Sequence, residues 1–230
     1  MSPVLQMELV IKIKQTTIKI KQTTINQNLK IKEMNIMKRL FSLLIVAFFS
    51  TAIYAQTTWN ADPMHSKLTF SITHLGISDV DGLFNKFSAS AITNKADFSD
   101  AVFELSTEVA SINTQVEMRD NHLRSADFFE VEKYPAMTFK STSISKVSEN
   151  KYKLNGNLTL RGITKPVSMN LWYRGTVEDA KSKKSTSGFQ LTGTLKRSDF
   201  NIGPKFPSPI LSDEVQIKAD GEFIKKTASL

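Results

Sequence analysis

The 230-residue chain contains no cysteine, only two tryptophans and only three histidines. Without cysteine it has no disulfide, no thiol nucleophile and no cysteine ligand for zinc or an iron–sulfur cluster. The sequence also lacks a glycine-rich phosphate loop and a Gly-x-Ser-x-Gly nucleophile elbow. These absences exclude several large classes of enzyme and leave few residues that could carry catalysis.

The excess positive charge lies at the front of the chain. Residues 1–55 carry 8 Lys and Arg against 2 Asp and Glu, whereas residues 56–230 carry 22 against 20. In the second part the basic residues are interleaved with acidic ones, so there is no basic stripe of the kind that follows a phosphate backbone. We therefore expect no nucleic-acid partner.

A tandem repeat marks residues 1–36. The heptapeptide IKIKQTT occurs at 11–17 and again, unchanged, at 18–24. Such low-complexity sequence has few large apolar groups with which to build a core. We expect residues 1–36 to be a disordered leader.

Residues 37–55 have the three parts of a secretory signal peptide. A basic pair at 38–39 precedes an apolar run at 40–49, and small residues follow that run. The run is too short for a comfortable bilayer span, which needs ~20 residues. We expect export, with cleavage after Ala55 or, as an alternative, after Ala52.

From Trp59 onward, apolar and polar residues alternate with a period of two. Leu68, Phe70 and Ile72 share one parity, and polar residues occupy the positions between them. One apolar and one polar face are typical of antiparallel strands that water wets on one side. About eight such strands predict an all-β fold, an extended eight-stranded antiparallel β-barrel. The same alternation returns at 103–109, 152–160, 167–173, 189–195 and 215–223.

One segment departs from this pattern. Thr114 and Glu117 have the spacing of a capping box, which predicts a short helical insertion that ends near Arg124. Arg119 and His122 lie three residues apart and would share one face of that helix. Their polar cluster either pins the helix to the barrel or forms a rim for the head of an amphiphilic ligand.

Several motifs occur in an order that resembles the YceI-like family. The resemblance covers about residues 58–225. Asn201 departs from the pattern, because the family commonly has glycine there, but asparagine also tolerates left-handed backbone geometry. The motifs are Asp62-Pro63-Met64-His65-Ser66, Phe70 to Ser78, Asp81-Gly82-Leu83-Phe84, Arg119 to Phe129, Gly156 to Gly162 and Arg197-Ser198-Asp199-Phe200.

The resemblance implies a lipocalin-like barrel over residues 56–230, exported to the periplasm. It implies a carrier or store that holds a polyisoprenoid, of the quinone or prenyl-phosphate type, in an apolar pore. It implies no catalytic activity. From the residues themselves we expect no metal and no cofactor. Transient contact with a membrane, and a dimer, are compatible with such a role.

Strand parity gives the residues that we expect to line the pore. A one-residue error in register would turn a strand's set outward. For the head group of the ligand we expect His65, Arg119 and His122. The pore set is Phe70, Ile72, Phe84, Phe103, Leu105, Met137, Phe139, Leu158 and Leu160.

Two other functions stay open at this point. The first is a histidine-based enzyme, with or without a metal, that uses His65, Asp120 and His122. The second is a structural barrel whose interior is filled by its own side chains. His74 has the inward parity of Phe70 and would then be an ordinary hydrogen-bonded barrel histidine.

Overall fold

The structure of the chain is a computed structural model, which describes residues 3–48 and 56–226. The chain divides into two compact units, with the boundary after Ile53. The two expected cleavage sites, after Ala52 and Ala55, lie outside the described residues. The leader and signal-peptide assignments therefore stay predictions.

The first unit is a single helix, α1 (Pro3–Phe48), where we had expected no regular structure over residues 1–36. No glycine or proline occurs at residues 4–48, and the Thr16 and Thr23 hydroxyls donate to carbonyls four residues back, at 2.8 Å. Its side chains over residues 11–38 are exposed. Among the described residues, no helix combines the length and hydrophobicity needed to cross a membrane.

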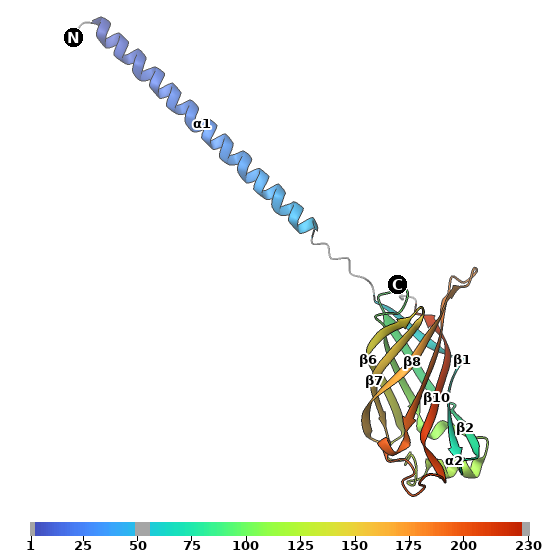
Figure 1. The fold of residues 1–230 in the computed structure, drawn as a ribbon. Helices are drawn as coiled ribbons and strands as arrows, with labels where there is room; N and C mark the ends of the chain where they lie inside the picture. The colour runs from blue at the N-terminus through green and yellow to red at the C-terminus, as the bar shows by residue number, and fades with distance from the viewer. Residues whose placement is uncertain (1–2, 49–55, 227–230) are drawn as a thin grey trace. The chain divides into compact units, whose positions relative to one another are not determined.

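The second unit is a closed barrel of eight antiparallel strands (Figure 1). Pairing between the last strand and the first closes the sheet, so the predicted eight-stranded antiparallel barrel is confirmed. The strands are β1 (Thr57–His74), β3 (Phe87–Thr93), β4 (Val102–Glu108), β6 (Ala136–Ser148), β7 (Lys151–Leu160), β8 (Ile163–Glu178), β9 (Ser185–Lys196) and β10 (Leu211–Lys225).

The long strand β1 has two neighbours on one side. Residues 57–60 pair with β3, and residues 68–74 pair with β2. The short strand β5 adds to β2, and α2 follows β5 at the end of the barrel where β1 finishes (Figure 1). We call this the α2 end. The remaining elements are β2 (Ser78–Phe84), β5 (Ile112–Asn113), α2 (Glu117–Arg124) and the 3₁₀ turns η1 (Val109–Ser111) and η2 (Arg197–Phe200).

The predicted helix exists and ends at Arg124, but the predicted capping box is wrong. Val116 occupies the N-cap position, with no side-chain capping bond. Gln115 has a φ of 64°, so the chain turns between Thr114 and the helix. The Thr114 hydroxyl donates instead to the buried carboxylate of Asp120, at 2.6 Å.

The turn at Asn201 has a backbone conformation that asparagine tolerates. Asn201 has φ 54° and ψ 38°, which is left-handed backbone. This conformation favours glycine and is tolerated by asparagine. The departure from the family pattern therefore leaves the turn intact.

The interior of the barrel holds two clusters of buried apolar side chains. At the Trp59 end, the cluster is mainly aromatic, with Trp59, Phe98, Tyr152, Tyr173 and Phe189. The cluster at the α2 end is mixed. It includes Leu68, Phe84, Phe128, Met137, Leu158, Leu160 and Phe200.

Candidate ligand-binding site

Between these clusters the barrel encloses a cavity of about 500 Å³ with walls that are almost wholly apolar. Small-molecule sites commonly have volumes of roughly 300–1,000 Å³. The interior is therefore not filled by the barrel's own side chains, which argues against the structural barrel.

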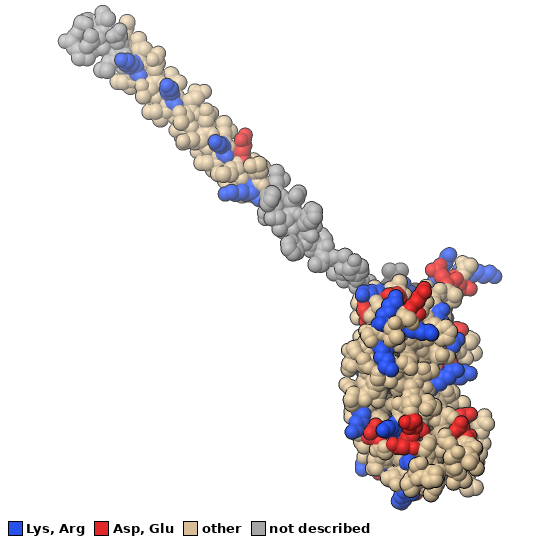
Figure 2. Space-filling model, in the orientation of Figure 1, with Lys and Arg blue, Asp and Glu red and all other residues tan. Residues whose placement is uncertain are grey.

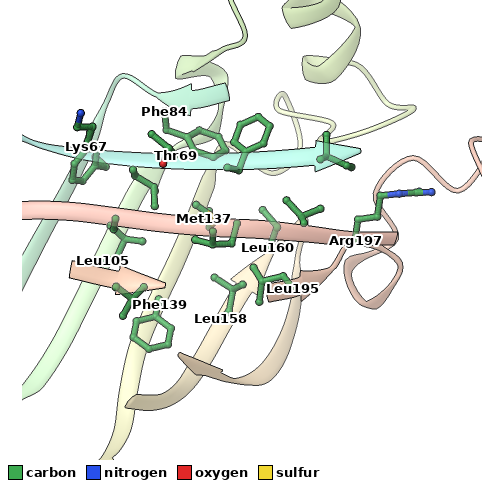
Figure 3. A pocket seen from close by; sticks show the side chains of 18 of the residues that line it. Lys67, Thr69, Phe84, Leu105, Met137, Phe139, Leu158, Leu160, Leu195 and Arg197 are labelled. Carbon is green, nitrogen blue, oxygen red and sulfur yellow. The ribbon is translucent and has the colours of Figure 1, made fainter. Parts of the chain in front are cut away.

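The nine pore residues predicted from strand parity all line this cavity. The alternation holds because each of these strands keeps one face inward. In Figure 3, Met137, Leu158, Leu160 and Leu195 turn toward a common space. Contact with a ligand stays a prediction for all nine. They are Phe70, Ile72, Phe84, Phe103, Leu105, Met137, Phe139, Leu158 and Leu160.

A buried aromatic cluster lies beneath the cavity at the Trp59 end, and its member Phe189 lies on the cavity wall. Phe98 is only 1% exposed, and its ring centre lies 5.3 Å from that of Trp59, 5.0 Å from that of Tyr173 and 4.8 Å from that of Phe189. Phe98 comes from the loop between β3 and β4 and not from a strand. We call Trp59, Phe98, Tyr152, Tyr173 and Phe189 the floor.

Hydrogen bonds hold the loop that carries Phe98 against the barrel. The carboxylate of Asp100 accepts from the backbone N–H groups of Asn94 and Lys95. The Tyr152 hydroxyl donates to the carbonyl of Asp97 at 2.7 Å, and burial raises the pKa of that hydroxyl. The loop that carries Phe98 is thus held both by hydrogen bonds within the loop and by a hydrogen bond from Tyr152 of the barrel.

At the α2 end, aromatic side chains narrow the mouth of the cavity. The rings of Phe128 and Phe206 stack with centroids 5.1 Å apart and planes 16° apart. The His122 ring meets both edge-on, at 5.0 and 5.7 Å. All three line the cavity, so His122 lies on the wall as a predicted head-group residue should.

Two polar contacts brace the stacked rings. Asp127 accepts a hydrogen bond from Lys205 at 2.7 Å, and its other oxygen lies 3.4 Å from Nε2 of His122. The bond from Lys205, and after it the contact with His122, lower the pKa of Asp127. These contacts join the loop before β10 to the turn after α2.

The buried side chain of Arg197 binds the backbone of the loop at the mouth. The side chain is 8% exposed, and its guanidinium donates to five backbone carbonyl groups. Because every donor nitrogen is used, the loop is held in one conformation around one side chain. The acceptors are Ser212, Ile202, Gly203, Phe206 and Leu211.

Arg119, the second predicted head-group residue, also lines the cavity. Its Nε donates to the Thr114 hydroxyl and its Nη2 to the Thr114 carbonyl, both at 2.7 Å. Asp120 accepts from the Thr114 N–H at 2.8 Å. The polar cluster on α2 therefore both pins the helix and reaches the cavity, so the two interpretations of the sequence do not exclude each other.

His65, the third predicted head-group residue, is not part of the cavity wall, so that prediction is wrong. The ladder between β1 and β10 shifts register between Ala61 and Ser66, and this bulge turns His65 to the outside, where its side chain is 60% exposed. There Nδ1 lies 2.9 Å from Asp62 and 4.0 Å from Glu222. The hydrogen bond with Asp62 raises the pKa of His65 and lowers that of Asp62.

The three residues of the enzyme hypothesis do not meet. His65 lies in the β1 bulge, whereas Asp120 and His122 belong to the mouth. Within the described residues, the one group of three possible metal ligands within 4.8 Å is Asp62, His65 and Glu222. These donor types suit Zn²⁺ and similar ions, but the group is exposed and its histidine is already paired with Asp62.

The family of the chain follows from comparison with known proteins. The model of the YceI-like domain matches residues 59–223, essentially the whole barrel. The chain belongs to the YceI-like family. A UPF0312 protein of Pectobacterium carotovorum is 36% identical over 170 residues, which cover 73% of this chain and 88% of that protein.

Two solved structures share the barrel. A YceI protein of Campylobacter jejuni has 32% identity and a TM-score of 0.60, covering 68% of this chain and 91% of its own. A polyisoprenoid-binding domain from Saccharophagus degradans has 16% identity and a TM-score of 0.52, covering 75% and 98%. The second likeness concerns the fold alone.

Proposed function

We propose that this YceI-like barrel binds a long-chain lipid of the polyisoprenoid class, with the tail inside the cavity, and acts as its carrier or store. The observation that carries the proposal is the cavity of about 500 Å³ inside the barrel, whose walls are almost wholly apolar. The name of the Saccharophagus degradans domain, a polyisoprenoid-binding one, agrees with it.

The energetics of such a site favour a tail over a polar metabolite. Each methylene moved from water to an apolar wall contributes ~0.8 kcal/mol, so ten contribute ~8 kcal/mol before ordering costs. Micromolar binding needs about 8 kcal/mol. A polar ligand would lose its hydrogen bonds with water on this wall and gain few in return.

We favour binding over catalysis because the polar groups near the cavity already serve the architecture. Arg197 holds the mouth loop, and Asp120 holds Thr114. His122 and Asp127 brace the stacked rings of the mouth. These structural contacts account for the positions of the polar groups without a catalytic role.

Delivery of a lipid would also involve contact with a membrane, and the α2 end has a surface suited to it. Ile77 is 84% exposed and Leu75 is 51% exposed in the turn between β1 and β2. The N–H of Leu75 donates to the carbonyl of Ile210, a residue of the cavity wall, at 3.0 Å. On the face shown in Figure 2, the tip beside α2 is mostly uncharged.

The binding proposal is tested by extracting the purified protein with organic solvent and identifying the extract by mass spectrometry. We expect an isoprenoid or a comparable long-chain amphiphile. Ala219 lies on the cavity wall, so Ala219→Phe should fill the space and lower the yield of lipid. Lys218→Phe puts the same side chain on the exposed face of the same strand and should leave the yield unchanged. Equal yields from both variants would contradict the proposal.

We further propose that residues 37–55 direct export to the periplasm. Fractionation of expressing Gram-negative cells, followed by N-terminal sequencing, tests this. A periplasmic protein that begins at Gln56, or at Ile53, is expected. A cytoplasmic protein that retains residues 37–55 would overturn it.

A further inference from the structure

Large apolar side chains are exposed on more than one side of the mouth at the α2 end. Leu75 and Ile77 are exposed in the turn between β1 and β2, and Met118, in the first turn of α2, is 83% exposed. Ile210, in the loop before β10, is 44% exposed. Single exposed apolar residues are common on protein surfaces, whereas a group of them around an opening indicates an interaction surface. We call Leu75, Ile77, Met118 and Ile210 the rim.

Contacts between the segments place the rim residues around one opening. The N–H of Leu75 donates to the carbonyl of Ile210 at 3.0 Å, so the β1–β2 turn adjoins the loop before β10. In that loop, the ring of Phe206 meets the His122 ring of α2 edge-on at 5.7 Å. Met118 precedes His122 by four residues and therefore shares its side of the helix. The rim thus borders the mouth from the turn, from the loop and from the helix.

The rim is continuous with the cavity wall. Ile210 lines the cavity and is also exposed, and Phe206 of the same loop lines the cavity too. An apolar tail that leaves the cavity past Ile210 therefore stays in contact with apolar side chains. A protein seated on the rim would cover the mouth, whereas a lipid bilayer would let the tail pass from the cavity into another apolar medium. This continuity favours a bilayer as the partner of the rim.

The segments around the mouth carry no net charge, because they contain 6 Asp and Glu and 6 Lys and Arg in total. The turn between β7 and β8 is included because Arg161 donates to the carbonyl of Ala126, in the turn after α2. Polybasic segments attract anionic membranes, and this end has no such excess of positive charge. Contact with a membrane must therefore depend on the apolar rim. The segments counted are residues 75–77, 109–135, 161–162 and 197–210.

We propose that the rim docks the barrel on a lipid bilayer, with Ile77 and Met118 inserted among the lipids and the mouth facing the membrane. These two side chains are the most exposed of the rim. The inference rests on the proposed lipid-binding function and names the partner with which the cavity exchanges its ligand. Burial of apolar side chains drives the docking, so a bilayer of neutral lipids suffices.

The test uses the absence of cysteine from the chain, since a single introduced cysteine can carry a fluorophore that reports on its own surroundings. Ile77→Cys, Met118→Cys and Val177→Cys are labelled with a nitrobenzoxadiazole dye and mixed with phosphatidylcholine vesicles. Val177, at the Trp59 end, is 70% exposed and is the matched control. We expect the emission at residues 77 and 118 to rise and to move to shorter wavelength, and the emission at residue 177 to stay unchanged. Because each dye reports locally, vesicle binding by another part of the chain does not imitate this result.

Removing one rim side chain measures its share in the docking. With the dye at residue 118, Ile77→Ser should raise the lipid concentration at half-maximal signal about tenfold, the effect of losing one inserted aliphatic side chain. Val177→Ser removes an exposed aliphatic side chain at the opposite end and should leave that concentration unchanged. Raising the salt from about 0.1 M to about 0.5 M should also leave it unchanged, because screening weakens only the attraction between charges. Loss of the signal at the higher salt would overturn apolar insertion as the driving force.

The remaining outcomes separate the possible occupants of the rim. A change at residues 77 and 118 that needs no vesicles and grows with protein concentration would mean that a second copy of the chain covers the rim, which overturns the inference. Equal changes at all three labelled residues, or no change at residue 77 or 118, would also overturn it. If the dyes stay silent while the solvent extract contains an isoprenoid, the docking fails and lipid binding stands. If the dyes respond but the extract contains no lipid, the proposed function fails and the membrane contact stands.

Discussion

Gly156 lies directly against the ring of Phe139 on the neighbouring strand. A Cβ atom at residue 156 would come within 2.4 Å of Phe139 Cζ and 2.6 Å of the Lys140 carbonyl oxygen. Both distances are far below van der Waals contact. The absence of a side chain at 156 is therefore what lets the Phe139 ring take its place on the cavity wall.

Gly156→Ala should destabilise the barrel by roughly 1–3 kcal/mol, the usual cost of overpacking a filled interior. The backbone oxygen of Lys140 cannot move as easily as the Phe139 ring, so the strand itself must shift. Urea unfolding followed by circular dichroism measures the change.

Gly188→Ala is the matched control for that substitution. A Cβ at residue 188 would meet only Arg174 Cβ, at 3.4 Å, and Gly188 has no positive φ. A compatible Gly→Ala change is neutral or stabilising by about 0.4–1 kcal/mol. Equal losses at both positions would show that close approach to Phe139 is not the cause.

Much of the wall could be predicted because strand parity needs only local information. Phe70 and Leu158 lie far apart in sequence, yet each follows the two-residue period of its own strand. His65 could not be placed by this rule, because the bulge between Ala61 and Ser66 breaks the period. Pro63, inside the run, was the available sign of that break, since proline cannot donate to a ladder.

The floor and the mouth depend on long-range packing, which one sequence does not reveal. Phe98 lies in a loop with no periodicity and acts through contacts with Trp59 and Tyr173. Arg197 was part of a family motif, but its role comes from carbonyls that the following loop brings around it. The inward parity of Tyr152, Tyr173 and Phe189 was the available sign of an aromatic end.

Arg197→Lys should loosen the mouth, because an ammonium cannot bond five carbonyl groups at once. Some of the buried carbonyl groups would lose their donor, and lysine lacks the planar, forked geometry of the guanidinium. We therefore expect the free energy of unfolding to fall by roughly 2–4 kcal/mol. Hydrogen exchange should rise selectively for the backbone N–H groups of Gly203 and Phe206. Both donate to carbonyl groups in the present structure.

Arg174→Lys provides the comparison for Arg197→Lys. Arg174 is 46% exposed and pairs with Asp220 on the outside of the barrel. Surface ion pairs contribute about 0–1 kcal/mol, so little change is expected. If Arg197→Lys lowered the free energy of unfolding as little as Arg174→Lys does, the guanidinium of Arg197 would not be what holds the loop.

The ion pair of the β1 bulge should be visible in the titration of His65. We expect NMR to find the pKa of His65 above the ordinary value, because Asp62 bonds its Nδ1. Asp62→Asn should lower this pKa toward the ordinary value, and Glu222→Gln should lower it less, since Glu222 lies farther away. No shift in Asp62→Asn would mean that the pair does not form in solution.

The sign of the linked stability follows from the direction of that shift. A raised pKa in the folded state means that the contribution of His65 is complete below its unfolded pKa of about 6.5. It is lost as the pH rises through the folded pKa. Asp62→Asn should therefore reduce stability more at pH 6 than at pH 9, as measured by urea unfolding at both values.

The aromatic floor should set the greatest length of tail that the cavity accepts. Phe98→Leu shortens the central side chain of the floor and should deepen the cavity, so the ratio of affinities for a C20 over a C15 prenyl phosphate should rise. Phe200→Leu alters an equally buried phenylalanine on the cavity wall at the α2 end. It should cost similar stability and enlarge the cavity at the opposite end from the floor, without changing that ratio. A large-to-small change in a core costs up to about 3–5 kcal/mol for Phe→Ala, so leucine keeps both variants folded. An unchanged ratio in Phe98→Leu would mean that the tail does not reach the floor.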